Sequence, residues 1–375
     1  MDTKDQMDAT SGSPFDTPGV MMPDTGTIPI SPDITDPAQS LDIPAAIVGD
    51  VKKLQKPPVS PFRESLQRLR RDKRAMISLG IIAFFVLVAI FGPLIYQHVG
   101  GPYTSHIDGA TYRPSVYHNY YHSELDRQDE LPSSQYWLGT NEIGQDILAR
   151  LMQGILVSLS VALVVEVVDI VLGILIGVLA GFFGGWIDFL LARFTDLMFA
   201  FPGLLFVILL TGIFGSSADD FFGHIPIIGP NGNARLLLVS LALAFTIWPL
   251  MARYVRGQTL QLKEQQFIEA ARTSGTTNVR IILRHIIPNL FSIVVVAATL
   301  DISNTIIGEA GISLLGLGVQ APGSSLGLMI ADASQFVQTH PFEVLVPSIT
   351  LAIIVLTFSF LGDGLRDAFD PRSKD

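Results

Sequence analysis

The feature that most constrains this chain is a series of long apolar segments that carry few or no charges. A helix that crosses a membrane needs about 20 mostly apolar residues. Six segments meet this requirement, and residues 76–96 contain no charged side chain. The six predicted spans are residues 75–96, 155–180, 189–214, 235–255, 288–311 and 344–363. Because backbone polar groups inside a bilayer must be paired within the protein, we expect an all-α polytopic membrane protein with six transmembrane helices.

The amino-acid composition supports the same fold class. Charged residues make up only 15% of the chain, whereas an average soluble domain carries about 25%. Apolar residues make up 49% of the 375 residues, and the mean hydropathy is +0.45. The chain has no cysteine, which excludes disulfide bonds, thiolate metal sites and cysteine nucleophiles.

Charge is segregated along the chain, and this segregation predicts an orientation. Residues 51–75 hold nine Lys or Arg against two acidic residues, and residues 253–287 hold six against two. Since Lys and Arg accumulate in cytoplasmic loops, both segments should be cytoplasmic. With six spans, both termini are then cytoplasmic as well. Residues 97–154, 215–234 and 312–343 should face outward from the cell (plasma or inner) membrane.

The N-terminal region divides into an acidic tail and a basic segment. The first 50 residues hold nine Asp and one Lys with few aromatic residues, a composition that cannot build a core. We expect residues 1–58 to be a disordered cytoplasmic tail, either solvated or folded back on the basic segment. Residues 59–74 predict a basic interfacial helix with Leu66 and Leu69 on its apolar face, in contact with membrane lipid.

The loop after the first span is rich in aromatic residues. Residues 97–136 contain six of the eight tyrosines, which suits a surface that meets a partner or the lipid headgroups. The candidate contacts are Tyr112, Tyr117, Tyr120 and Tyr121. His118 and His122 are four residues apart and on a helix could share a metal ion, but the spacing fixes no third ligand. We therefore predict no metal site here.

The second predicted span carries small residues at a regular spacing. Gly173, Gly177 and Gly181 recur every four residues, so they lie on one face of a helix. Small residues on one face allow a second helix to approach closely. We expect this stripe to be a helix-packing surface.

The same span also carries two carboxylates, Glu166 and Asp169. A carboxylate at the bilayer centre costs about 3 kcal/mol on insertion scales, so these side chains should face protein or water. They could line a translocation path, or they could be buried partners of Arg193 or Arg253. The same two alternatives apply to Asp196, Asp301 and Glu309.

The sequence lacks the motifs of an intramembrane enzyme. No HExxH zinc motif is present, and the nearest string to a GxGD protease motif, FLGDG at 360–364, lacks the first glycine. No histidine lies inside a predicted span, and no Gly-Lys dipeptide is available for a Walker A loop. We predict a non-catalytic subunit that binds no cofactor of its own and no nucleic acid.

The basic loop before the fifth span has the pattern of two short helices joined by a glycine. Residues 264–290 read EQQFIEAARTSGTTNVRIILRHIIPNL. The apolar face of the first helix consists of Phe267, Ala270 and Ala271. Gly275 should end this helix, and Pro288 should mark the entry to span five. We call residues 264–290 the elbow. The elbow is either a rigid protrusion that fits a groove in a partner protein or an ordinary surface loop.

This stretch resembles the EAA signature of permease subunits in binding-protein-dependent ABC importers. The matching positions are Glu269, Ala270, Ala271, Gly275 and Pro288. Residues 136–154, 309–327 and 361–372 resemble further motifs of the dipeptide/oligopeptide branch, and the C-type permease is the better match. The departures are His285, Ile286 and Ile287 before the proline, and Asn141, Gln145 and Ala149 in the first motif. The resemblance covers about residues 61–372.

The resemblance implies a type I ABC importer permease fold, with a core over residues 155–366 and a cytoplasmic tail over 367–375. Its partners would be a second homologous permease, two ATPase subunits that bind ATP and Mg²⁺, and an extracytoplasmic peptide-binding protein. A coupling helix at 264–275 would sit in an ATPase groove. There Glu269 would make polar contacts and Gly275 would supply the turn.

Two other functions remain open from the residues. Related permeases serve several solutes, so nickel is an alternative cargo to peptides. The other alternative to a peptide importer is an ion-coupled carrier or channel that uses Glu166 and Asp169, although this hypothesis does not explain the elbow.

Overall fold

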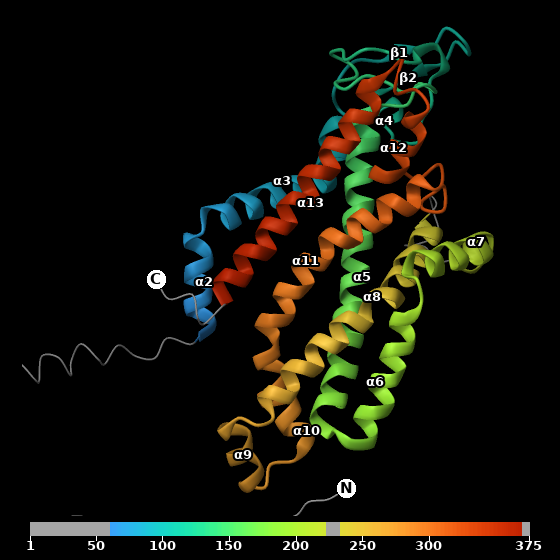
Figure 1. The fold of residues 1–375 in the computed structure, drawn as a ribbon. Helices are drawn as coiled ribbons and strands as arrows, with labels where there is room; N and C mark the ends of the chain where they lie inside the picture. The colour runs from blue at the N-terminus through green and yellow to red at the C-terminus, as the bar shows by residue number, and fades with distance from the viewer. Residues whose placement is uncertain (1–60, 223–232, 370–375) are drawn as a thin grey trace, which may run out of the picture. The chain divides into compact units, whose positions relative to one another are not determined.

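The computed structural model describes residues 61–222 and 233–369, and the predicted tail 1–58 lies outside them. The described residues are helical apart from one short hairpin and the loops (Figure 1). The long helices are α3 (Lys73–Tyr96), α5 (Ile147–Phe183), α6 (Gly185–Ala200), α7 (Gly203–Phe222), α8 (Asn233–Leu262), α11 (Ile287–Leu314) and α13 (Pro341–Phe369). The short elements are α2 (Pro61–Arg71), β1 (Tyr103–Thr104), β2 (Thr111–Tyr112), α4 (Pro114–Tyr117), η1 (Leu125–Arg127), α9 (Gln266–Thr273), α10 (Asn278–Ile281), the π-helical turn η3 (Ile282–Ile286) and α12 (Leu326–Ser334).

Within the described residues, five helical runs are long and apolar enough to cross a membrane, and a bent pair of helices makes up to six. The bent pair is α6 and α7, whose axes differ by 75°. The predicted span 189–214 is therefore not one continuous helix. Phe201 has an extended backbone, with φ −75° and ψ 133°. The physical reason is Pro202, because a proline disfavours helical geometry at the preceding residue.

The helices extend beyond the apolar windows that predicted them. Helix α5 begins at Ile147, well before the predicted residue 155, because the Asp146 side chain accepts hydrogen bonds from the backbone N–H groups of Leu148 and Ala149. This is an N-cap, which satisfies donors that the first helical turn leaves free. A search for apolar segments does not detect such a polar first turn as part of the helix.

The helical run at the fifth span is longer than predicted. Pro288 lies in the first turn of α11, where the sequence places the entry, but α10 and η3 continue the run upstream to Asn278. The π-helical turn η3, Ile282–Ile286, comes directly before α11. A proline lacks the N–H for the normal helical bond, and π-turns are one of the usual places where a helix accommodates such an interruption.

The glycine stripe of α5 lies against α8. A Cβ atom at Gly177 would be 2.6 Å from the backbone oxygen of Ala252, and one at Gly181 would be 2.9 Å from that of Arg256. A Cβ at Gly173 would be 2.4 Å from the Met251 side chain. The backbones approach so closely that only glycine fits, which is the packing that the spacing predicts.

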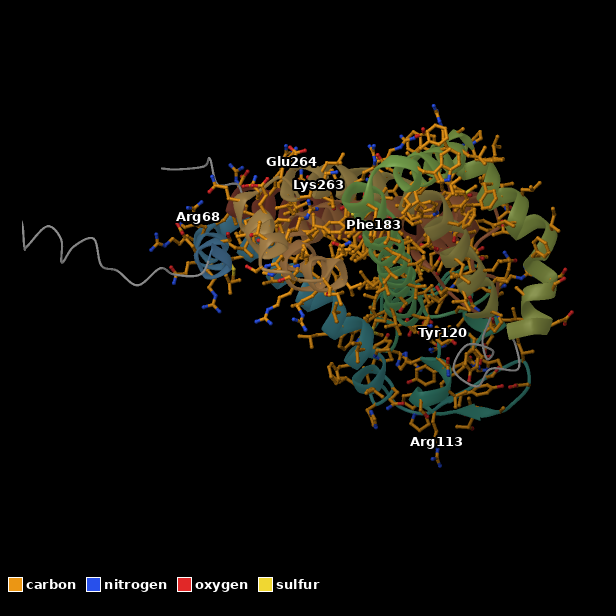
Figure 2. The ribbon with its side chains drawn as sticks, turned by 90° about the horizontal axis from the view of Figure 1, so that it is seen from below. Arg68, Arg113, Tyr120, Phe183, Lys263 and Glu264 are labelled. Carbon is orange, nitrogen blue, oxygen red and sulfur yellow. The ribbon has the colours of Figure 1, made fainter. Side chains whose placement is uncertain are left out.

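The connections gather at opposite ends of the long helices. Residues 97–146, with β1, β2 and α4, form what we call the loop end (Figure 1). Helices α9 and α10 lie at the other end, which we call the elbow end (Figure 1). In the view from below, Lys263 and Glu264 mark the chain leading into α9, and Tyr120 marks the loop (Figure 2).

Gly177→Ala tests the contact between α5 and α8. The added methyl group meets the Ala252 backbone oxygen, so we expect a loss of roughly 1–3 kcal/mol from overpacking. The measurement is thermal unfolding of the purified chain in detergent. The matched control is Gly257→Ala in α8, where a Cβ meets nothing within 4 Å. That variant should gain up to about 1 kcal/mol of helix propensity, and equal destabilisation of both variants would contradict the packing argument.

Candidate functional site

The elbow ends its first helix with a defined backbone motif. The Gly275 N–H donates to the Arg272 carbonyl at 2.9 Å, and the Thr276 N–H donates to the Ala271 carbonyl at 3.1 Å. Gly275 has φ +76°. This pair of bonds with a left-handed glycine is a Schellman cap, so the predicted glycine stop is present. The turn leads directly to α10, whose N-cap residue is Thr277.

A buried isoleucine that the sequence reading missed fixes the elbow to the spans. Ile268 is fully buried in an apolar cluster that includes Ile281, Ile286 and Val255. Its neighbours on α9 point away, and Phe267 is 44% exposed. The sequence offered two adjacent apolar residues, Phe267 and Ile268, and no signal of which one is buried. Glu269 and Ala270 are also exposed, whereas Ala271 is half-buried.

Two ion pairs hold the first half of the bent pair against α8. The Arg256 guanidinium donates to both carboxylate oxygens of Asp188, at 2.5 and 2.8 Å. Arg253 donates to Asp196 at 2.8 Å, and Arg193 lies 3.9 Å from the same carboxylate. Bidentate pairs of this kind add orientation as well as energy. Helix α6 is thereby tied to the helix that leads into the elbow.

These ion pairs bear on the alternative that Glu166 and Asp169 are buried partners of Arg193 or Arg253. The two arginines that were candidate partners for Glu166 and Asp169 both lie beside Asp196 instead. Glu166 is 5% exposed and Asp169 fully buried, and none of their carboxylate oxygens has a hydrogen-bond partner among the described residues. Asp301 of α11 lies close enough to interact electrostatically with both. Three carboxylates from α5 and α11 therefore gather inside the protein.

Asp301 also lines a cavity of about 780 Å³ between α8, α11 and α13. The lining is mostly apolar, and Arg253 and Arg366 contribute its positive charges. A pocket with apolar walls and a few charged groups is the usual form of a small-molecule site.

Glu309 does not fit the prediction that it lines a path. Its side chain is 1% exposed and accepts hydrogen bonds from Ser158 at 2.9 Å and from Ser313 at 2.7 Å. Ser325 donates to Ser313 at 3.3 Å. This carboxylate ties α5 and α11 to the segment before α12, which corrects the expected role. Ser313 lies one helical turn from Glu309 on α11, but Ser158 comes from α5, 151 residues earlier in the sequence, and no local pattern could reveal that partner.

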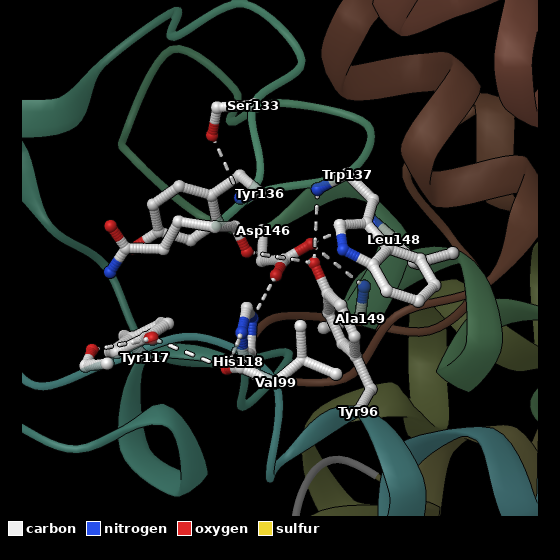
Figure 3. Close-up of polar contacts among 12 residues, drawn as sticks. Tyr96, Val99, Tyr117, His118, Ser133, Tyr136, Trp137, Asp146, Leu148 and Ala149 are labelled. Atoms are coloured by element: carbon white, nitrogen blue, oxygen red, sulfur yellow. Dashed lines mark hydrogen bonds and ion pairs between the residues drawn. The ribbon is translucent and has the colours of Figure 1, made fainter.

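At the loop end, His118 and Asp146 form the centre of an aromatic cluster (Figure 3). The His118 Nδ1 atom lies 2.6 Å from the Asp146 carboxylate, and its Nε2 atom lies 3.1 Å from the Val99 carbonyl. Both side chains of the pair are fully buried. Because both ring nitrogens already have acceptor partners, His118 has no nitrogen left to share a metal ion with His122.

The tyrosines of this loop divide into buried and exposed groups. Tyr117 is 1% exposed, packs against the Tyr136 ring and donates to the Gly101 carbonyl at 3.0 Å. The expectation that Tyr117 contacts a partner is therefore wrong. Tyr121 is 50% exposed and remains available. Tyr112 and Tyr120 are half-buried.

A second polar tie holds the hairpin to the rest of the loop. Tyr103 donates to the Asp126 carboxylate, which also accepts the His106 backbone N–H at 2.8 Å. Burial acts to raise the pKa of Asp126, but these hydrogen bonds outweigh it and lower the pKa to about 2. Burial and the Asp126 hydrogen bond raise the pKa of Tyr103 to about 12. The donor and acceptor therefore keep their protonation states across the physiological range.

Comparison with known proteins identifies the family. Residues 173–375 match the family described as binding-protein-dependent transport system inner membrane component, and residues 60–114 match the N-terminal transmembrane domain of oligopeptide transport permease C. The chain belongs to this family of ABC transporter permeases. It is a multi-pass membrane protein and the non-catalytic membrane component of such a system, of the oligopeptide permease C type.

Curated relatives agree over most of the permease's length. The dipeptide transport system permease protein DppC of Alkalihalophilus pseudofirmus is 35% identical over 84% of this chain and 91% of its own. The oligopeptide transport system permease protein OppC of Bacillus subtilis is 33% identical, over 90% of this chain and 98% of its own. The glutathione transport system permease protein GsiD of Escherichia coli is 35% identical, over 84% and 92%.

Among solved structures, the permease is similar to a chain of the MetNI methionine ABC transporter in inward facing conformations. The TM-score is 0.45 at 19% identity, and the match covers 58% of this chain and 96% of that chain.

Variants of Asp146 test the pairing at the loop end. Asp146→Ala removes the cap of α5, which costs about 0.5–2 kcal/mol, and leaves a buried His118 nitrogen unpaired, which costs about 1–3 kcal/mol more. Asp146→Asn keeps a good capping side chain and should be clearly more stable than the alanine variant. Thermal unfolding of the purified permease compares the two. Identical losses in both variants would show that capping contributes nothing.

Proposed function

We propose that this permease forms half of the translocation pathway of an ATP-driven importer for dipeptides or oligopeptides. The observation that carries the proposal is the elbow, an exposed knob whose backbone is capped at Gly275 and whose Ile268 is embedded in the core of the spans. A permease of this family works with ATPase and binding-protein partners. Relatives of comparable similarity bear the names of dipeptide, oligopeptide and glutathione systems, and this range favours a peptide-like cargo.

The proposed coupling runs from the elbow into the spans. Helix α9 would sit in the groove of one of two ATPase subunits, with Phe267, Glu269 and Ala270 exposed toward the groove. Ala271 is half-buried and would lie between the ATPase groove and the spans. Ile268 lies in the same cluster as Val255 of α8 and Ile286 before α11. A displacement of α9 by ATP-driven closure would therefore act on α8 and α11, which line the cavity with Asp301.

Phe267→Ala tests the coupling surface. Removing this exposed ring takes apolar contact area from the interface while leaving the buried Ile268 anchor in place. We expect the variant to fold normally but to recover at least fivefold less ATPase subunit in a pull-down from mild-detergent membranes, measured by mass spectrometry.

The matched control is Leu66→Ala in α2, because Leu66 is 41% exposed and Phe267 is 44% exposed. The control should recover the ATPase chains and a second permease subunit like the unmodified chain. Full recovery of the ATPase with Phe267→Ala would contradict the proposed groove contact.

The orientation in this proposal places the elbow end in the cytoplasm and the loop end outside. Two basic segments support it, since α2 carries Arg68, Arg70 and Arg71 in its last turn, and the elbow carries Arg272 and Arg280. Both termini would then be cytoplasmic. The loop end would receive the binding protein. Exposed apolar side chains there, at Ile107, Tyr121 and Leu131 among others, offer contact area.

The cluster of Glu166, Asp169 and Asp301 would serve the path in a state other than the one described. A peptide carries a positively charged amino terminus, and buried carboxylates near a cavity suit a cationic group. An ion-coupled carrier could use the same carboxylates, but such a carrier needs no elbow.

Uptake by the reconstituted complex tests cargo and energy source together. Proteoliposomes that hold the complete complex should import a labelled dipeptide only with ATP inside and binding protein outside. Tyr121→Ala should raise the binding-protein concentration needed for half-maximal uptake about threefold or more.

Two outcomes of this assay would overturn the proposal. Import of nickel in place of the dipeptide would assign a different cargo to the same family architecture. Uptake by the purified chain alone under an ion gradient would replace ATP coupling with ion coupling.

A further inference from the structure

We propose that the loop end binds a divalent transition-metal ion between the loop and the start of α13. The ligands are Asp129, His340 and Glu343, whose coordinating atoms all lie within 4.8 Å of one another. Asp129 belongs to the loop after α3, whereas His340 and Glu343 flank the first residues of α13. The ion would therefore join two parts of the chain that are about 200 residues apart in sequence.

Each of the three side chains directs an unsatisfied polar atom into this site. Asp129 Oδ1, His340 Nδ1 and Glu343 Oε2 are shielded from solvent and have no hydrogen-bond partner among the described residues. Glu343 is 6% exposed, so its carboxylate is largely removed from bulk solvent. An unpaired buried carboxylate is costly, and a bound cation removes that cost.

The charge around the site is also unbalanced. Glu142 adds a third carboxylate that interacts electrostatically with Glu343, as Asp129 does. Arg150, which lines the same small pocket as Glu343, pairs with Asp332 at 2.7 Å instead.

The His340 side chain faces the carboxylates, with Nδ1 3.7 Å from Asp129 Oδ1. A proton on this ring supplies one positive charge, whereas a divalent ion supplies two. Metal binding therefore compensates three carboxylates better than protonation of the histidine does.

The backbone presents Asp129 to the site. The Asp129 N–H donates to the Asn141 carbonyl at 3.1 Å, and the next residue, Glu130, is bonded through its N–H to the Thr140 hydroxyl at 2.9 Å. Gly139, in the same turn, has φ +80°, and a Cβ there would lie 2.2 Å from the Glu130 carbonyl. These contacts hold the turn that carries Asp129 against residues 139–141.

The donor set indicates the class of metal. One imidazole nitrogen with two carboxylates suits Zn²⁺ or a similar borderline ion better than Ca²⁺ or Mg²⁺, which prefer oxygen ligands alone. Ligands at about 2.1 Å from a tetrahedral Zn²⁺ lie about 3.4 Å apart. The 3.7 Å between His340 and Asp129 is already close to that value, and both side chains are partly exposed, at 39% and 33%, and free to adjust.

The test is Zn²⁺ binding to the purified full-length permease in detergent, carrying no polyhistidine tag and stripped with a chelator. Calorimetric titration with ZnCl₂ should show one equivalent bound with a micromolar or tighter Kd. His340→Ala and Glu343→Gln should each weaken that affinity at least tenfold. Zn²⁺ should raise the Tm of the unmodified chain by several degrees and leave both variants unchanged.

The matched control is His106→Ala, an exposed loop histidine outside the cluster, which should bind Zn²⁺ like the unmodified chain. Ca²⁺ and Mg²⁺ should neither bind with comparable affinity nor raise the Tm. The proposal is overturned if no equivalent binds, if His340→Ala binds as tightly as the unmodified chain, or if Ca²⁺ and Mg²⁺ bind equally well. These measurements need no transport, so they are independent of the proposed cargo.

Discussion

The backbone contact between α5 and α8 is the interaction on which the rest of the described structure depends. Three glycines leave α5 without side chains on the contacting face, and the backbone oxygens of Ala252 and Arg256 fill the space. Once α8 is fixed in this way, its arginines reach Asp188 and Asp196 and hold α6. Its C-terminal end then leads into α9, so the position of the elbow follows from a contact made inside the membrane.

Helix α5 links that contact to the opposite end of the protein. Its first turn is capped by Asp146, and the same carboxylate pairs with buried His118. The loop is thereby attached to the helix that carries the glycine stripe. Helices α5 and α8 therefore connect the loop end to the elbow. In the proposed function, a displacement of α9 would be passed along these two helices toward the loop end.

The roles of the buried acidic side chains cannot be distinguished from the sequence alone. Glu166, Asp169 and Glu309 look alike in sequence, since each is a carboxylate within an apolar span. In the folded chain Glu309 meets two serines, whereas Glu166 and Asp169 meet no hydrogen-bond donor among the described residues. A carboxylate with donors is a structural tie, and one without them is available to a ligand. One of the serines, Ser158, comes from another helix, and the sequence does not show that it meets Glu309.

The sequence by itself determined five of the membrane-spanning segments, the glycine stripe and the elbow with its stop at Gly275, because each depends on residues within a few helical turns. The remaining predicted span, 189–214, is broken at Phe201. The sequence also carried the four motifs that resemble the importer permeases. Tertiary structure alone decided that Tyr117 is buried and that Ile268 anchors the elbow. It also decided that Asp129, His340 and Glu343 meet. Burial and ligand geometry depend on side chains that are distant in sequence, and hydropathy and spacing do not specify which of these come together.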